Sequence, residues 1–436
     1  MKQILLILVL ITWCSHIDGA EKGGKVVCFY DSQTLNGLEI TRVGPNELKP
    51  ALGLCNYLVY GYAGINKRTF EVESLNPHID LSTGLNNYHN VTHFKESHPA
   101  IKFLLSIGGF HDPVDKDNKY LKLLEEQKRR GDFINSVVKL VKEYNFDGVD
   151  LGWEFPLRIE KKNRTKIGKI VHAIGNLFSS KEDKKQKEHK DQFTTLVKEL
   201  AAALRGENKI LTLTILPHVN CDAYYDAAAL EHLVEHVHLM TLDYKTPEKN
   251  EEEGDFSAPM QYVYGREPED NVEASVKWWK DNQFPANKLL IAVATYGVTW
   301  KMTKDSGKSG VPPIREADGP GEAGPYLQRY GRLSYYELCP LLAIPSVAND
   351  SVTLLQRVPD VSKRQGTYAF RPATKDLEGI WVSYDDPEVA AQKARHVKIN
   401  GLGGVVVVDI TYDDFKGTCD NTRTFYPILS AVKMNL

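Results

Sequence analysis

The sequence predicts an α/β protein: a (β/α)8 or TIM barrel with a small α+β domain inserted between its seventh and eighth strands. Three observations predict this fold. Eight short apolar runs recur along the chain, helical stripes separate several of them, and the 436 residues exceed the length of about 250 typical of such a barrel. Near-continuous hydrophobicity is typical of parallel strands that are covered on their outer side.

The eight predicted strands share this apolar character and are Val26–Tyr30, Tyr57–Tyr62, Ile101–Ile107, Phe146–Pro156, Ile210–Leu216, Val237–Tyr244, Leu289–Tyr296 and Gly404–Ile410. Two intervening segments repeat apolar residues at helical spacing, through Phe133, Val137, Leu140, Val141 and Tyr144, and through Phe193, Leu196, Val197, Leu200 and Leu204. Strand and helix therefore alternate, as a barrel requires.

The chain begins with a predicted secretory signal peptide, residues 1–20. Lys2 precedes an apolar segment from Ile4 to Trp13, and the small residues Gly19 and Ala20 follow. This segment is too short to span a membrane. We therefore expect a secreted, extracellular protein without a membrane span.

The barrel is predicted from residues 21–299 and 386–436, and the inserted domain from residues 300–385. The insertion begins rich in Gly and Pro and then contains alternating stretches such as Thr367–Phe370 and Ile380–Tyr384. A structureless loop of this length would be unusual, so a small α+β domain is the better interpretation.

A second insertion, Leu157–Lys190, follows the fourth strand and holds eleven Lys and Arg against four Asp and Glu. One interpretation is a solvated loop. The other is a polyanion contact through Arg158–Lys190. The net charge of −3 over the whole chain gives no indication of nucleic-acid binding.

Five cysteines remain after the signal segment, so at least one is unpaired within the chain. Cys28 and Cys55 lie at consecutive apolar runs and are predicted to form a disulfide. Cys339 and Cys419 are predicted to form a second one, so Cys221 is expected to be unpaired within the chain. The acceptor sequons at Asn90, Asn163 and Asn349 are candidate glycosylation sites in a secreted protein.

His232, Glu235 and His236 match the H-x-x-E-H zinc pattern. They close a short segment that runs directly into a predicted strand, and no third ligand is evident. We therefore expect no metal site there.

The predicted strand Phe146–Pro156 carries the chemistry. Apolar residues alternate with Asp150, Gly152 and Glu154, so the two carboxylates are expected inside the barrel and the apolar side chains outside. Pro156 cannot continue the ladder, which places Glu154 near the carboxyl end, where such barrels hold their active sites. Gly152 leaves a gap between the two acids.

These motifs resemble the chitinase family of substrate-assisted glycoside hydrolases, family 18, across the mature chain. The similar segments are Phe103–Gly109, Phe146–Pro156, Met240–Asp243, Leu333–Cys339 and Trp381–Pro387. In that family a carboxylic acid protonates the glycosidic oxygen and the acetamido oxygen of the substrate attacks the sugar.

The resemblance implies that Glu154 occupies the acid position, with Asp147 and Asp150 in supporting positions and Asp243 on the sixth strand. Gly152 replaces the aspartate that orients the acetamido group. Leu242 replaces a tyrosine that binds this group, and Val408 replaces the tryptophan beneath the sugar. The resemblance also implies carbohydrate contacts at Trp153, Met240 and Asp243. No intact catalytic set remains, so we expect no chitinase activity.

Within the family the chain is most similar to the insect imaginal disc growth factors, through its Lys-rich insertion and the Val-Val-Asp-Ile ending of the eighth strand. This resemblance implies a secreted, non-catalytic chitinase-like protein, without cofactors, that acts as a monomer on an unknown receptor or extracellular surface. The alternatives are a lectin for chitin oligosaccharides and a residual chitinase that uses Glu154.

Overall fold

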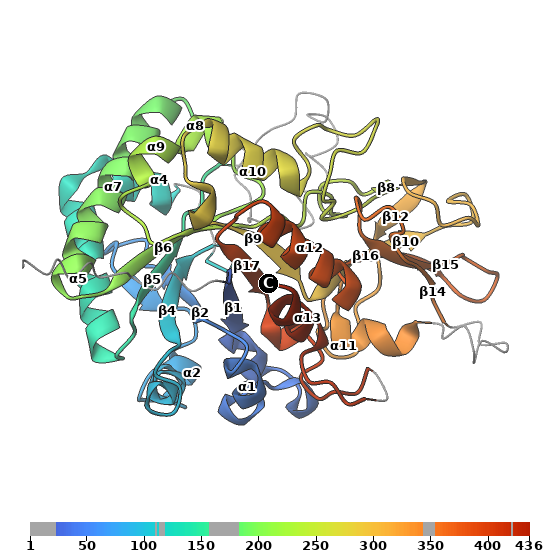
Figure 1. The fold of residues 1–436 in the computed structure, drawn as a ribbon, viewed down its shortest axis with the longest axis horizontal. Helices are drawn as coiled ribbons and strands as arrows, with labels where there is room; N and C mark the ends of the chain where they lie inside the picture. The colour runs from blue at the N-terminus through green and yellow to red at the C-terminus, as the bar shows by residue number, and fades with distance from the viewer. Residues whose placement is uncertain (1–22, 110, 113–117, 157–182, 343–353, 420–421) are drawn as a thin grey trace, which may run out of the picture.

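Eight parallel strands close into a barrel in the computed structural model, which describes residues 23–109, 111–112, 118–156, 183–342, 354–419 and 422–436 (Figure 1). The strands are β1 (Lys25–Asp31), β2 (Tyr57–Ile65), β4 (Lys102–Gly108), β5 (Gly148–Gly152), β6 (Ile210–Ile215), β7 (Val237–Leu239), β9 (Leu289–Ala294) and β17 (Gly404–Val408). Pairing of β1 with both β2 and β17 closes the sheet. The predicted barrel is confirmed.

Each strand coincides with one of the predicted apolar runs, but several strands end earlier than predicted. β5 ends at Gly152 and β7 at Leu239. The residues beyond these points keep the alternation of side chains without keeping the ladder of hydrogen bonds. The polar residues of the predicted strand ends therefore lie on loops at the mouth of the barrel.

Helices cover the outside of the barrel (Figure 1). They are α1 (Pro45–Leu52), α2 (Pro77–Asp80), α3 (Asn87–Thr92), α4 (Lys119–Glu125), α5 (Gln127–Glu143), α7 (Gln186–Gly206), α8 (Cys221–Tyr224), α9 (Ala227–Leu230), α10 (Val272–Asp281), α12 (Pro387–Ile399) and α13 (Pro427–Asn435). In α7 all five predicted stripe residues are buried. Burying each such side chain stabilises the fold by about 1.5–3 kcal/mol, so packing rather than helix propensity holds this layer.

Successive side chains of β5 point to opposite sides of the sheet, as the alternation predicts. Val149 and Leu151 join the large core between barrel and helices. The lumen holds a second apolar cluster with residues such as Phe29, Leu104 and Val406. The inward face of β5 therefore points into a lumen that is packed, not open.

A second sheet lies beside the barrel, to the right in Figure 1. It is antiparallel, with the order β12 (Ala317–Pro320), β10 (Tyr296–Met302), β16 (Gly379–Tyr384), β15 (Thr367–Arg371) and β14 (Gln356–Val358); β13 (Arg332–Ser334) also pairs with β10. The short helix α11 (Tyr335–Leu338) follows β13. This is the additional α+β unit, and its first strand begins shortly after β9.

Three short strands complete the pairing. β3 (Val72–Ser74) runs antiparallel to the end of β2. β8 (Glu253–Gly254) pairs with β11 (Ile314–Arg315), which joins the loop after β7 to the inserted domain. The loops on this side of the barrel are thus tied to the second sheet.

Both predicted disulfides are present, Cys28–Cys55 with a Cα–Cα distance of 6.0 Å and Cys339–Cys419 with 5.5 Å. Cys221 is a half-buried free thiol. No helix in the described part of the chain is long and apolar enough to cross a membrane.

Several predicted features fall outside the described residues. These are the signal segment, the sequons at Asn163 and Asn349, and most of the insertion Arg158–Lys190. The sequon residue Asn90 is exposed on α3, and its amide donates to the Leu85 carbonyl at 3.0 Å. Glycosylation of these residues stays a prediction.

Candidate functional site

The mouth of the barrel lies at the carboxyl ends of the parallel strands, so residues that follow different strands meet there. Asp31 ends β1, Glu154 follows β5, Asp243 follows β7 and Asp409 follows β17. Of these, Glu154 and Asp243 were predicted. The carboxylates therefore come from both halves of the chain and gather on one face.

Glu154 is nearly buried and has a partner that the sequence analysis missed. Its Oε2 lies 3.1 Å from Nε2 of His218, and only 7% of the Glu154 side chain and 13% of that of His218 are exposed. His218 follows β6, the strand next to β5. Its position directly after a predicted strand was the signal that could have identified it.

Asp150 lies deeper in the lumen than Gly152 and is fully buried. Four groups surround its carboxylate: Ser106 Oγ at 3.0 Å, Thr212 Oγ1 and Thr214 Oγ1 each at 2.8 Å, and His238 Nδ1 at 3.0 Å. Burial acts to raise the pKa of Asp150, but His238 and the hydroxyl donors outweigh it and lower that pKa below its usual range. Its hydrogen-bonding capacity is thus used within the protein.

Asp147 lies at the opposite end of the strand, before β5 begins. Its Oδ2 accepts a hydrogen bond from the Phe103 amide at 2.8 Å, and its Oδ1 pairs with Lys95 Nζ at 3.1 Å. The supporting position that the resemblance implies for Asp147 lies at the amino end of the barrel, because a residue that precedes a barrel strand lies there. Asp147 instead fixes the start of β4 against β5.

At Gly152 a carboxylate is missing, although there is room for a side chain. A Cβ at this position would lie 3.4 Å from the amide nitrogen of Gly109 and 3.5 Å from its Cα, which is ordinary van der Waals contact. The backbone there does not require glycine. A carboxylate side chain could start from this position, but none is present between Asp150 and Glu154.

Leu242 and Met240 belong to the buried apolar cluster of the lumen, and half-buried Val408 packs against it. This part of the mouth therefore offers methyl and thioether groups rather than hydroxyl donors or an aromatic plane. Hydroxyl and amide groups of a sugar would find few hydrogen-bond partners on these three side chains.

Asp243 connects the barrel to the inserted domain. Its Oδ2 accepts hydrogen bonds from Tyr296 Oη at 3.0 Å and Arg332 Nη2 at 3.2 Å. Burial acts against the charge of Arg332, but Asp243 and Glu248 raise its pKa, so the guanidinium stays charged. The Asp243 carboxylate thus lies at the rim of the barrel, and protein side chains already bind its Oδ2.

Trp153 was expected to contact carbohydrate, and the structure corrects this. Its side chain is fully buried, with ring centroids of Tyr120 at 5.0 Å, Phe193 at 5.8 Å and Phe133 at 6.2 Å. The alternation that directs Glu154 inward directs Trp153 outward against the helices. No face of its indole ring is open to a sugar.

An aromatic pair that the sequence did not predict lies at the mouth instead. The rings of Tyr62 and His111 are stacked, with centroids 4.4 Å apart and an interplanar angle of 16°. His111 Nε2 lies 3.8 Å from Asp31 Oδ2, and Tyr412 Oη donates to the same oxygen at 3.2 Å. Burial lowers the pKa of His111, against the charge of Asp31.

The H-x-x-E-H residues do not form a zinc-protease helix. α9 ends at Leu230, before the motif, and His232 is exposed whereas His236 is fully buried. Burial lowers the pKa of His236 well below its usual range. Among the described residues, no group of three or more His, Cys, Asp or Glu side chains is arranged to hold a metal ion.

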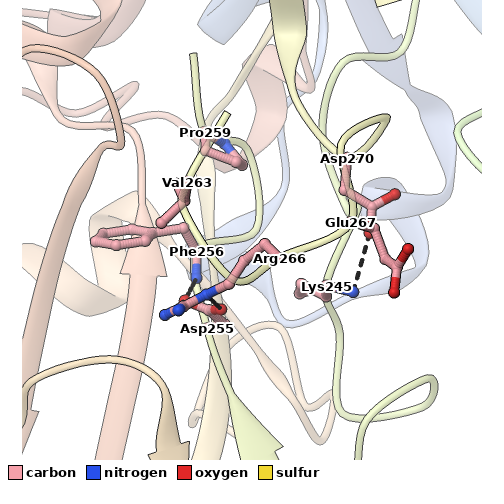
Figure 2. Close-up of a pocket in the computed structure, with 8 residues that line it drawn as sticks. All are labelled: Lys245, Asp255, Phe256, Pro259, Val263, Arg266, Glu267 and Asp270. Atoms are coloured by element: carbon pink, nitrogen blue, oxygen red, sulfur yellow. Dashed lines mark hydrogen bonds and ion pairs between the residues drawn. The ribbon is translucent and has the colours of Figure 1, made fainter. Parts of the chain in front are cut away.

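A separate small hollow lies between Phe256 and the segment that precedes α10 (Figure 2). Two ion pairs border it, Arg266–Asp255 at 2.6 Å and Lys245–Asp270 at 2.9 Å. It has room for about one water molecule, which is too little for a sugar. This hollow is therefore not a candidate sugar site.

Comparison with known proteins agrees with this architecture. A family model described as glycosyl hydrolases family 18 matches residues 25–413. Chitinase-like protein Idgf4 of Drosophila melanogaster is 45% identical over 419 residues, or 94% of each chain, and imaginal disk growth factor 6 of the same fly is 41% identical over 452 residues, or 100% of each. The Group II chitinase catalytic domain 2 of Ostrinia furnacalis matches with a TM-score of 0.79 and 26% identity over 95% of this chain and 97% of that chain.

Proposed function

Because the chain belongs to the family 18 glycosyl hydrolases, we propose that it is a secreted, non-catalytic chitinase-like protein, an extracellular effector of the growth-factor-like or immune-related kind. The observation that carries the proposal is the set of side chains around Glu154. The acid has Gly152, Leu242 and Val408 where the chemistry needs an aspartate, a tyrosine and a tryptophan. An acid that cannot hold the acetamido group in the reacting geometry gains little rate.

The pairing of Glu154 with His218 supports the same conclusion. Oε2 of Glu154 contacts the His218 imidazole, so this oxygen has a protein partner where the reaction requires a glycosidic oxygen. Secretion is supported by the signal-like residues 1–20 and by two disulfides, which persist in oxidising compartments. The protein acts as a monomer on a receptor or another extracellular surface.

The catalytic part is tested by incubating the purified protein with a fluorogenic chitotrioside beside its Glu154→Gln variant. We expect equal, background rates for the two proteins. Turnover by the unmodified chain above that of the variant would instead establish a residual chitinase that uses Glu154.

The effector part is tested on cultured insect cells. The purified protein should change proliferation in a saturable, dose-dependent manner, and the Glu154→Gln variant should act equally well because no hydrolysis is involved. An activity that disappears in this variant would tie signalling to the acid and contradict the proposal.

A second candidate function is a lectin for chitin oligosaccharides, which the stacked Tyr62–His111 pair at the mouth favours. Calorimetric titration with chitohexaose distinguishes it, since saturable micromolar binding would support the lectin.

The basic insertion Arg158–Lys190 is proposed as a polyanion contact. Retention on heparin that survives neutralisation of Lys161, Lys162, Lys184 and Lys185 would remove this role.

A further inference from the structure

A hollow of about 450 Å³ lies at the end of the barrel opposite the mouth. Its wall includes Lys25, the first residue of β1, and Gly403, which directly precedes β17. Because these two parallel strands begin there, the hollow lies at their amino ends, and we call it the amino-end hollow. Its volume falls within the range of about 300–1,000 Å³ that is typical of small-molecule pockets.

Hydrogen bonds fix the backbone around the amino-end hollow. The Lys25 amide donates to the Gly403 carbonyl at 2.9 Å, and the Gly403 amide donates to the Leu289 carbonyl at 2.8 Å. The starts of β1, β17 and β9 are thereby held together. The wall is part of the hydrogen-bonded frame of the barrel, so a ligand would meet a preformed site and little ordering would oppose binding.

Aliphatic side chains form the apolar part of this wall. Val397 and Leu402 lie on either side of the end of α12, and Leu436 follows α13. The Leu436 side chain packs against the backbone of Gly24, where an added Cβ would lie 2.9 Å from its Cγ. Among the described residues that line the hollow, none is aromatic. Such a wall suits an alkyl chain better than a sugar, because pyranose rings pack on aromatic surfaces.

Two large apolar side chains beside the hollow are open to water. Ile399 follows the lining residue Lys398 at the end of α12 and is 82% exposed. Met434 lies two residues before Leu436 and is 78% exposed, and α13 packs along α12. An alkyl chain that extends from the hollow would cover part of this surface, which favours binding.

Three lysines give this end of the barrel its charge. Lys25 and Lys398 line the hollow, and Lys433 is exposed in the last turn of α13. No ion pair or hydrogen bond joins their ammonium groups to another described residue. Three ammonium groups against the one terminal carboxylate of Leu436 leave an excess of positive charge. Cations of this kind beside a hollow favour an anionic ligand.

We propose that the amino-end hollow binds the anion of a medium-chain fatty acid. The carboxylate lies between Lys25 and Lys398, and the alkyl chain runs along Val397, Leu402 and Leu436. This class of ligand combines the two features of the wall, an aliphatic surface and unpaired ammonium groups. The proposal goes beyond the function proposed above and does not rest on it, because the hollow and the barrel mouth lie at opposite ends.

Calorimetric titration of the full chain at neutral pH with hexanoate, octanoate and decanoate, each below its micelle concentration, tests the proposal. The affinity should rise by about fourfold for each added CH₂ group, the effect of burying one methylene. Decanoate should also bind about tenfold or more tightly than decylammonium, because the head group meets lysines. Absence of binding, affinity independent of chain length, or equal affinity for the two decyl ions would overturn the proposal.

Variants locate the carboxylate. Lys25→Gln combined with Lys398→Gln should weaken decanoate binding by about tenfold or more. Lys198→Gln is the matched control, since it removes an exposed lysine of α7 that does not line the hollow, and its affinity should be unchanged. A double variant that binds decanoate as tightly as the unmodified chain would contradict the assignment of these two lysines.

A membrane surface is the other source of an acyl chain with an anionic head group. Sedimentation with phosphatidylserine vesicles separates this source from a fatty acid in solution. We expect the protein to remain in the supernatant while it binds decanoate. Sedimentation with the vesicles that is lost in the variant with both lysines replaced would assign this face to a membrane and overturn the proposal.

Discussion

Oε2 of Glu154 and Nε2 of His218 lie 3.1 Å apart at the mouth of the barrel, and both side chains are largely shielded from water. The two residues follow adjacent strands, β5 and β6. The acid position is thus occupied, but its carboxylate is engaged by a neighbouring imidazole.

His218→Ala should destabilise the protein, because it leaves the buried Glu154 carboxylate with one partner fewer. We expect a loss of about 1–3 kcal/mol in the free energy of unfolding, measured with urea at neutral pH. His232→Ala is the matched control, since 84% of that side chain is exposed. Equal stability of the two variants would show that the Glu154–His218 contact contributes nothing.

Gly152→Asp alone should not create chitinase activity. A Cβ fits at this position, but Leu242 and Val408 still offer no hydroxyl and no aromatic plane to the sugar. Hydrolysis of a fluorogenic chitotrioside should stay at the level of Glu154→Gln. Turnover by this single variant would show that Leu242 and Val408 matter less than we argue.

The combination Gly152→Asp, Leu242→Tyr and Val408→Trp should restore hydrolysis that depends on Glu154. Adding Glu154→Gln to it should lower the rate by about 10²–10⁴-fold, the usual contribution of general acid catalysis. If the quadruple variant hydrolyses the substrate as fast as the triple variant, the cleavage does not use Glu154.

The barrel could be predicted because its strands are apolar runs and its helices carry regular stripes, two signals that lie in short stretches of sequence. The inward direction of Glu154 followed from the same alternation. The carbohydrate contact of Trp153 came from the family resemblance, whereas the alternation of the strand turns the indole outward, where it is buried. Asp147, which the resemblance placed in a supporting position, lies at the amino end of the barrel because it precedes β5.

The partners at the mouth could not be predicted from local patterns. His218 meets Glu154 only through the register of β5 and β6, and Asp409 meets Asp31 only because β17 closes the barrel on β1. These pairings depend on the three-dimensional order of the strands. No spacing within the sequence encodes them.

Asp409→Asn should stabilise the protein increasingly as pH rises. Burial and Asp31 raise the pKa of Asp409 in the folded state, whereas an unfolded aspartate has a pKa of about 3.9. Between these values the folded chain binds more protons, so its stability falls with pH by up to about 1.4 kcal/mol per pH unit from this group. The asparagine variant lacks this slope.

Urea unfolding of both proteins at about pH 4, 5, 6 and 7 measures the difference. The gap between the variant and the unmodified chain should widen with pH. A constant gap would mean that the folded state does not raise the pKa of Asp409.

Asp150 should show the opposite dependence. Although burial acts to raise its pKa, His238 and the hydroxyl groups of Thr212 and Thr214 lower it in the folded state. The stability that comes from this carboxylate is therefore present above the unfolded pKa of about 3.9 and is lost as pH falls through the lower folded pKa. Asp150→Asn should cost about 1–3 kcal/mol at neutral pH, the typical penalty when buried hydrogen-bonding groups lose their partner. That cost should shrink in urea unfolding at about pH 3, while Asp376→Asn should change stability by less than about 0.5 kcal/mol at both values. An equal cost at both pH values would show that the carboxylate charge does not stabilise the lumen.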